Sequence, residues 1–159
     1  MMVIVSDTSP ITSLIQINQL ALIHKVFDNV VIPESVYAEL CRVPNQKDLL
    51  DIQTWIFVQK ASDRQKVAEL ETELDAGEAE AITLALEVKA DFLIIDEWTG
   101  REKAEELGIK IIGVLGLLLR AKKDGLILTV KDLMDELIYK AEFRIHPILY
   151  RQVIKSAGE

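Results

Sequence analysis

The sequence is poor in cysteine and histidine. Among its 159 residues there are one Cys and two His. Cys41 has no second cysteine in the chain with which to form a disulfide, and clusters of Cys and His that hold soft metal ions are excluded. Because a chain without disulfides suits a reducing compartment, we expect a cytoplasmic protein.

Long hydrophobic runs are also missing. The apolar runs, such as those at residues 92–95 and 114–119, fall far short of the roughly 20 residues that a membrane-spanning helix needs. The N-terminus has no basic segment leading into an apolar signal core, because Ser6 and Asp7 interrupt the first apolar run. We therefore expect a protein that is not exported and has no membrane partner.

Positive charge is scarce. The chain has 18 Lys and Arg against 26 Asp and Glu, which gives a formal net charge of −8. This balance argues against a broad basic surface for nucleic acid, since phosphate binding usually relies on clustered cations. Part of the acidity can belong to a metal site, where a bound divalent cation reverses the local field.

What the chain does have is a large share of hydrophobic residues. They make up 50% of the sequence, enough for one well-buried core and too few residues for two ordinary domains. We find no internal repeat and no low-complexity linker. The sequence therefore predicts a single domain over residues 1–159.

The hydrophobic pattern alternates between two periods along the chain. Short apolar or β-branched runs predict strands at residues 2–5, 30–32, 56–58, 92–95 and 110–112. Helices are predicted from helical spacing of apolar residues, from Pro10 and Pro33, and from capping residues. They lie at residues 10–15, 20–23, 33–43, 49–55, 63–74, 75–89, 97–107, 114–123, 129–143 and 147–156. A polar turn is predicted at 44–47. Alternating strands and helices predict an α/β fold, a three-layer α/β/α sandwich with a mostly parallel central sheet that includes the C-terminal helices at about 129–157.

Two of the clearest strands end in an aspartate. Asp7 follows the first apolar run and Asp96 follows the run at residues 92–95. In open α/β sheets, ligands bind beyond the carboxyl ends of the strands, so both carboxylates are expected at the functional crevice. The alternative is that each aspartate only caps the helix that follows it.

Glu39 is a third acidic candidate. Its spacing from Val36 and Val43 places it beside the apolar stripe of its helix, where a carboxylate needs a partner. Metal ligation would supply one. An ion pair with Arg42, three residues on, is the alternative.

Glu78 and Glu80 compete for a fourth position. Residues two apart on a helix diverge around its axis, so only one of them can serve a small site. Glu78 stands three residues after Asp75 and can close a capping box, whereas Glu80 interrupts an Ala- and Leu-rich segment without such a role. We predict Glu80 as the ligand and Glu78 as the cap, with the reverse assignment left open.

Carboxylates gathered without lysines repel one another, and a hard divalent cation relieves that repulsion. Mg²⁺ or Mn²⁺ suits ligands that are all oxygen. Such a cation activates water and stabilises the oxygens of a phosphodiester during hydrolysis. The pattern therefore favours a metal-dependent nuclease.

These residues together resemble the PIN-domain family, and each short motif keeps the family's order along the chain. The resemblance rests on Asp7-Thr8-Ser9, Glu39, residues 77–82, residues 93–97, Arg101, Gly108, residues 113–116 and residues 157–159. Within the family, the chain looks closest to a prokaryotic branch related to the VapC toxins of type II toxin-antitoxin pairs.

The resemblance implies a Rossmann-like sheet and an endoribonuclease that depends on Mg²⁺ or Mn²⁺, with RNA as substrate. It also implies a homodimer and silencing by a cognate antitoxin protein. The implied catalytic and metal-binding residues are Asp7, Glu39, Glu80 and Asp96, with Glu97 as an auxiliary ligand, Thr8 or Ser9 near phosphate or water, and Arg101 at the substrate. For Arg101 the alternative is an ion pair with Glu97 within the same helix.

Two other functions compete with this interpretation. One is a catalytically inactive PIN-like module that binds a partner protein through the apolar helices around residues 14–27 and 49–57. The other is a phosphatase with Asp7 as nucleophile. Ser9 disfavours the phosphatase, because such enzymes place a second aspartate two residues after the first.

Overall fold

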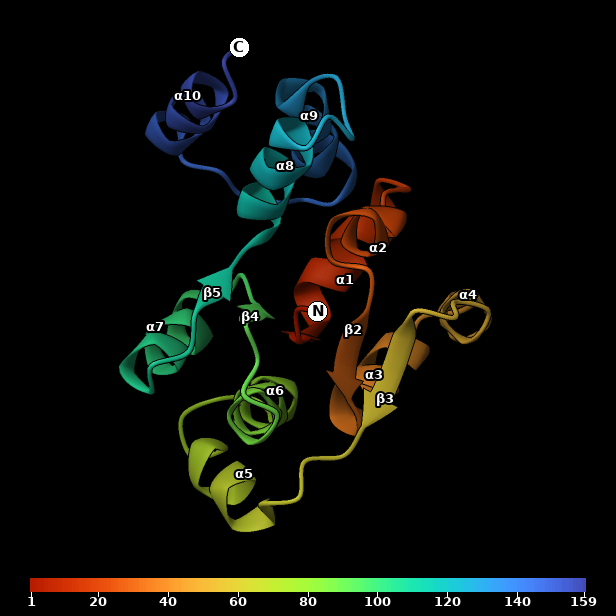
Figure 1. Ribbon diagram of the computed structural model, residues 1–159, viewed down its shortest axis with the longest axis vertical. Helices are drawn as coiled ribbons and strands as arrows, with labels where there is room; N and C mark the ends of the chain where they lie inside the picture. The colour runs from red at the N-terminus through yellow and green to blue at the C-terminus, as the bar shows by residue number, and fades with distance from the viewer.

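A single all-parallel sheet forms the centre of the computed structural model, which describes residues 1–159 (Figure 1). Its strands are β1 (Ile4–Ser6), β2 (Val30–Pro33), β3 (Ile56–Gln59), β4 (Phe92–Ile94) and β5 (Ile111–Ile112). They lie in the order β3-β2-β1-β4-β5, and Val5 of β1 is in register with Val31 of β2 and Leu93 of β4. The order reverses between β1 and β4, so the crevice beyond their carboxyl ends is the expected ligand position.

Helices cover both faces of the sheet, which confirms the predicted α/β/α sandwich (Figure 1). They are α1 (Thr8–Gln16), α2 (Ala21–Phe27), α3 (Glu34–Cys41), α4 (Gln46–Asp51), α5 (Arg64–Leu70), α6 (Ala76–Glu87), α7 (Trp98–Glu106), α8 (Val114–Lys123), α9 (Val130–Lys140) and α10 (Pro147–Ser156). None of them has the length and hydropathy that a membrane crossing requires.

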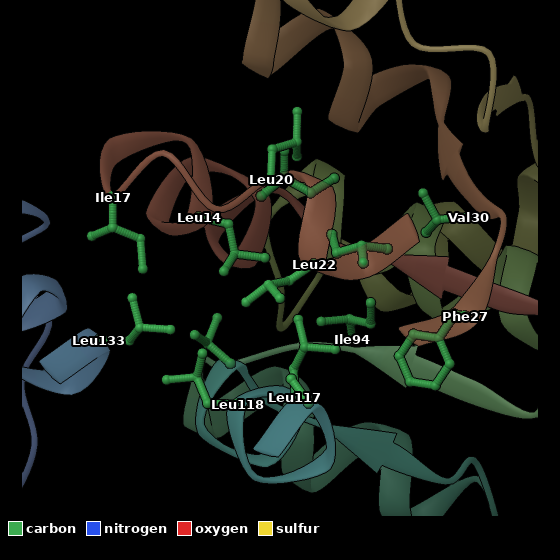
Figure 2. Close-up of a cluster of buried hydrophobic side chains, with 14 of the residues drawn as sticks. Leu14, Ile17, Leu20, Leu22, Phe27, Val30, Ile94, Leu117, Leu118 and Leu133 are labelled. Carbon is green, nitrogen blue, oxygen red and sulfur yellow. The ribbon is translucent and has the colours of Figure 1, made fainter. Parts of the chain in front are cut away.

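The larger hydrophobic core lies between one face of the sheet and helices α1, α2, α8 and α9 (Figure 2). Leu14 of α1, Leu22 of α2, Leu117 of α8 and Ile94 of β4 are almost completely buried in it. Burying one such side chain stabilises the fold by about 1.5–3 kcal/mol relative to leaving it exposed. This core fixes the start of α1, and with it Asp7, against the end of β1.

The opposite face of the sheet is covered mainly by α6, flanked by α5 and α7. Every residue of α6 from Gly77 to Ala85 is buried. This explains why the helix is rich in Ala and Leu rather than amphipathic. It also means that the two glutamates of α6 must find partners, because buried polar groups are nearly always satisfied.

All the predicted helices are present, but several boundaries differ. The helices predicted at 33–43 and 129–143 end sooner, at Cys41 and Lys140, and the helix predicted at 49–55 is displaced to 46–51. The break between α1 and α2 lies where expected, at Asn18, whose φ of 56° is left-handed. The turn predicted at residues 44–47 is shorter, because α4 begins at Gln46, whose side chain is buried. The helix predicted at 63–74 ends at Leu70 and is followed by turns.

The end of the chain is held by the carboxylate of Glu159. It accepts hydrogen bonds from the backbone N–H groups of Val130 at 2.7 Å and Lys131 at 3.1 Å. It also pairs with Lys122 Nζ at 3.0 Å. Glu159, three residues beyond the end of α10, thus caps the first turn of α9 and contacts α8, since a carboxylate is favourable at a helix N-terminus.

Candidate metal centre

An acidic cavity of about 320 Å³ lies beyond the carboxyl end of β1. Its walls carry four carboxylates from four separate segments, namely Asp7, Glu39, Asp75 and Glu97. Asp7 and Glu97 are the N-cap residues of α1 and α7, and Asp75 is the N-cap of α6. No Lys or Arg lines this cavity. We refer to it below as the acidic cavity.

Three of the carboxylates in this region approach closely enough to share one cation. One oxygen from each of Asp75, Glu78 and Glu97 lies within 4.8 Å of the other two. Glu78 Oε2 is buried and has no hydrogen-bond partner. An unpaired buried oxygen beside two further carboxylates fits a hard divalent cation, whose preferred ligands are oxygens.

Burial dominates the electrostatics of Asp7 and Glu78. Burial raises the pKa of Asp7 to about 7, and the nearby Asp75, Glu39 and Glu97 carboxylates act in the same direction. Burial likewise raises the pKa of Glu78 to about 8, helped by Asp75 and by Asp7. A bound cation would favour the ionised forms of both groups.

Glu39 reaches the cavity from α3 because Gly77 has no side chain. A Cβ atom at Gly77 would lie 2.5 Å from Glu39 Oε1 and 3.3 Å from Thr8 Oγ1. Burial raises the pKa of Glu39, and the charge of Asp75 adds to the effect. The ion pair with Arg42, considered above as the alternative, does not form.

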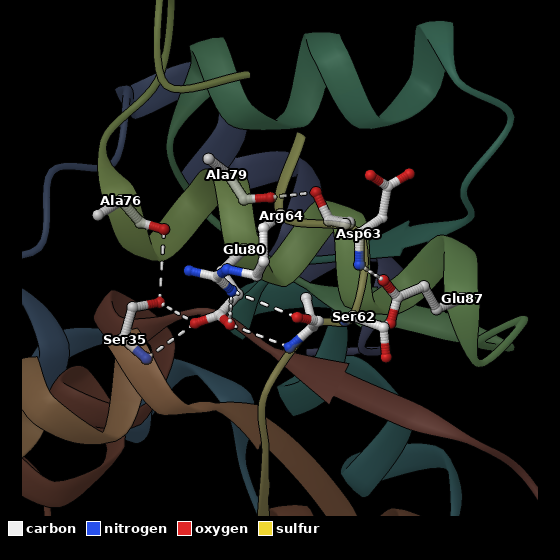
Figure 3. Close-up of polar contacts among 10 residues, drawn as sticks. Ser35, Ser62, Asp63, Arg64, Ala76, Ala79, Glu80 and Glu87 are labelled. Carbon is white, nitrogen blue, oxygen red and sulfur yellow. Dashed lines mark hydrogen bonds and ion pairs between the residues drawn. The ribbon is translucent and has the colours of Figure 1, made fainter. Parts of the chain in front are cut away.

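Glu80 does not line the acidic cavity, and its carboxylate lies instead against Ser35 and Arg64 (Figure 3). Its Oε1 accepts hydrogen bonds from Ser35 N at 2.9 Å and Ser35 Oγ at 2.6 Å. Its Oε2 accepts from Ala61 N at 3.0 Å and pairs with Arg64 Nη1 at 2.7 Å. Both oxygens are therefore occupied in holding α6 to the start of α3 and to the segment before α5.

The geometry favours Glu78 over Glu80 as the member of this cluster. The two side chains do diverge around α6 as expected, but Glu78 is the one that faces Asp75 and Glu97. Its role in the capping box, which the structure confirms, uses only Oε1. Oε2 takes no part in the capping box and has no hydrogen-bond partner.

Asp96 does not line the acidic cavity. Its Oδ1 accepts a hydrogen bond from Val114 N at 3.0 Å at the start of α8. Burial raises the pKa of Asp96, while the charge of Arg101 opposes the shift. The cap of α7 is Glu97 and not Asp96, so the residue predicted as an auxiliary ligand is the one placed in the cluster.

The three predicted substrate contacts lie on two sides of this region. Thr8 and Ser9 line the acidic cavity, and Ser9 Oγ is buried without a partner. Arg101 Nη1 donates to the carbonyl oxygen of Ile95 at 2.7 Å, and Arg101 forms no ion pair with Glu97. Arg101 therefore lies outside the acidic cavity and contacts the end of β4.

Sequence reasoning gave Asp75 only a capping role. The structure places it both in the capping box and in the cluster. Its position as N-cap of a buried helix, three residues before Glu78, was a usable signal, because a capping box places its two acidic side chains at the same helix end.

Comparison with known proteins gives one family match. A family model described as a PIN domain matches residues 3–159, which includes every strand of the sheet and both C-terminal helices. No curated protein matches the chain.

Proposed function

Because the chain belongs to the PIN-domain family, whose members are commonly nucleases, we propose that it hydrolyses RNA phosphodiester bonds at the acidic cavity with a divalent cation. The observation that carries the proposal is the convergence of Asp75, Glu78 and Glu97. A nuclease without histidine or cysteine at its site needs such a cluster.

Asp75, Glu78 and Glu97 are the residues that would hold the cation, with Asp7 and Glu39 close enough to add to the negative field. When bound there, Mg²⁺ or Mn²⁺ supplies Lewis acidity for activating water and stabilising charge on the phosphodiester oxygens. The donor set contains only oxygen, which suits either ion.

The remaining residues of the cavity orient the substrate and accept or donate protons. The carboxylate of Asp7, which lines the cavity and which a bound cation would keep ionised, is suited to accept a proton from an attacking water. Thr8 and Ser9 have hydroxyl groups on the same wall, which can donate hydrogen bonds to phosphate oxygens. With no cationic side chain in the cavity, a phosphodiester is expected to enter only together with a cation.

The direct test is cleavage of a labelled single-stranded RNA in Mn²⁺. The wild type is expected to cleave, whereas Asp7→Asn and Glu78→Gln lose at least about 100-fold in rate, as expected when a group acting on the reacting atoms is removed. Glu105→Gln, a change at an exposed position of α7, is the matched control. Equal cleavage by all four proteins would refute the proposal. Phosphate release from an aryl phosphate would instead favour the phosphatase.

We further propose that the protein is the toxin of a type II pair, acting in the cytoplasm as a homodimer that a cognate antitoxin inhibits. The support is the resemblance to VapC-related chains. Expression of the wild type is expected to stop growth, while the Asp7→Asn variant is tolerated. Equal growth of both strains would remove the toxin role and leave the nuclease proposal intact.

A further inference from the structure

A second cavity, of about 490 Å³, is lined by Asp96 and Trp98, the residues on either side of Glu97 of the acidic cavity. It is formed by the start of α7, by β5, by the start of α8 and by the segment from α9 to α10. Aromatic, aliphatic and cationic side chains share its walls, including Trp98, Leu115, Phe143, Leu149, Arg101 and Arg144. We call this cavity the aromatic groove.

Trp98 is the most unusual residue of the aromatic groove. Its side chain is 76% exposed, whereas the other tryptophan, Trp55, is 6% exposed and stacks on His24. An exposed indole contributes little to the hydrophobic stability of the fold. Trp98 also follows Glu97 directly, so a residue of the acidic cavity and a residue of the aromatic groove are consecutive.

The charge of the aromatic groove is opposite to that of the acidic cavity. Arg101 and Arg144 line it, and its one carboxylate, Asp96, is engaged by Val114 N through Oδ1. Arg101 uses Nη1 on the carbonyl of Ile95, and a guanidinium has five N–H donors in total. In a chain with a net charge of −8, two arginines beside an exposed indole are complementary to a base and its phosphate.

We propose that the aromatic groove binds an unpaired base of the RNA strand whose phosphodiester lies in the acidic cavity. The base stacks on Trp98, and Arg144 contacts a neighbouring phosphate. This inference rests on the proposed function for the identity of the strand. The base must be unpaired, because a base within a duplex is already stacked on both of its faces and is not free to lie on the indole.

The charges favour RNA over a second copy of the chain as the occupant. A contact between copies would bury Trp98 and Leu149 but would also bury the two guanidinium groups, whose desolvation is costly unless carboxylates of the other copy meet them. A single strand of RNA offers an aromatic face and a phosphate at adjacent positions. It therefore satisfies both features of the groove at once.

The test uses the intrinsic fluorescence of Trp98. A short single-stranded RNA is titrated into the protein with Ca²⁺ in place of Mg²⁺ or Mn²⁺, and affinity is measured separately by the anisotropy of labelled RNA. We expect saturable quenching in the wild type. Trp98→Leu is expected to lose the quenching and to bind roughly 10- to 100-fold more weakly, which is the usual effect of removing one stacking contact.

Two variants and one probe make the result specific. Trp98→Phe keeps an aromatic face and is expected to stay within a few-fold of the wild-type affinity. Tyr139→Leu removes another aromatic side chain, 84% exposed on α9, and is expected to change neither signal. The same RNA annealed to its complement is expected to quench much less.

Unchanged RNA affinity of Trp98→Leu would overturn the inference, as would a fall from dimer to monomer in Trp98→Leu without loss of RNA binding. If the wild type cleaves RNA in Mn²⁺ and Trp98→Leu binds normally, only the base-binding role fails. If the wild type shows quenching that depends on Trp98 but never cleaves, the nuclease proposal fails and the base-binding role stands.

Discussion

Glu78 and Asp75 exchange hydrogen bonds at the start of α6. The N–H of Glu78 donates to Asp75 Oδ1 at 2.8 Å, and the N–H of Asp75 donates to Glu78 Oε1 at 3.3 Å. This reciprocal pair fixes both side chains before any ligand arrives. Glu78 Oε2, buried and unpaired, is left facing Gly100, where a Cβ atom would lie only 2.6 Å away.

We predict that Mn²⁺ stabilises the wild type. Binding to the folded state alone adds about 2.7 kcal/mol when the free ion is at 100 times its dissociation constant. In Glu78→Gln the amide oxygen can still close the capping box, but the variant lacks the charge, so most of this gain should disappear. Thermal melts with and without Mn²⁺ measure the difference, with Glu105→Gln as control. A full Mn²⁺ shift in Glu78→Gln would exclude Glu78 as a ligand.

The raised pKa values predict an unusual pH dependence for the metal-free protein. The pKa of Asp7 is about 7 when folded, against an ordinary value of 3.8, so the folded state binds the proton more tightly than the unfolded state. The stabilisation of the folded state by protonated Asp7 is fully present below about pH 4 and is lost as the pH rises through about 7. Glu78, with a pKa of about 8, extends the decline to higher pH.

Urea unfolding at several pH values between 5 and 9 measures this decline. In Asp7→Asn the decline should be smaller, and at pH 8 the metal-free variant should be more stable than the wild type by on the order of 1–3 kcal/mol. Mn²⁺ should suppress the decline in the wild type. A stability that rises steadily with pH in metal-free wild type would contradict the assignment.

Glu80 should affect stability without affecting metal binding. Glu80→Ala leaves the N–H groups of Ser35 and Ala61 and the guanidinium of Arg64 without their acceptor, and should cost about 2–4 kcal/mol. Denaturant unfolding measures the loss. The remaining folded protein should still show the Mn²⁺ shift, and a variant that loses that shift while staying folded would restore Glu80 as a ligand.

The pH dependence of Glu80 has the opposite sign to that of Asp7. Burial acts to raise the pKa of Glu80, but the hydrogen bonds from Ser35, Ala61 and Arg64 outweigh it and hold the pKa below its ordinary value. Its contribution is therefore present above about pH 4.5 and is lost as the pH falls through the lowered pKa. Comparing Glu80→Gln with the wild type from pH 3 to pH 6 isolates this loss.

Gly77→Ala should disturb the cavity although alanine is the better helix former. The added Cβ would lie 2.5 Å from Glu39 Oε1, so the carboxylate must move or the first turn of α6 must shift. We expect a net cost of about 1–3 kcal/mol and a weaker Mn²⁺ shift. Gly77→Ala combined with Glu39→Ala removes the clash. Recovery of stability in the double variant supports this reason, and no recovery counts against it.

The sequence predicted the sheet and the helices on both of its faces, and it placed the candidate site at the carboxyl ends of the strands. This was possible because apolar periodicity and helix caps are local signals, and because the carboxyl ends of parallel strands meet at one edge. Asp7, Glu39 and Glu97 accordingly lie around one cavity.

The individual ligands were harder to predict, because the deciding contacts join distant parts of the chain. The hydrogen bonds that occupy Glu80 come from Ser35, 45 residues away, and from Ala61 and Arg64, 19 and 16 residues away. The local sequence of α6 contains no signal for these hydrogen bonds. Asp96 and Glu97 are consecutive, yet Asp96 accepts a hydrogen bond from the first N–H of α8 whereas Glu97 lines the cavity.

The placement of Glu80 and Glu78 on opposing sides of α6 has a mechanical consequence. The hydrogen bonds of Glu80 to Ser35 and Ala61 oppose rotation of α6 about its own axis. Any adjustment to ions of different radius must then come from torsions of the Glu78, Asp75 and Glu97 side chains. Selectivity among divalent ions should therefore depend on how freely these three side chains can change rotamer, because the backbone that carries Glu78 stays in place.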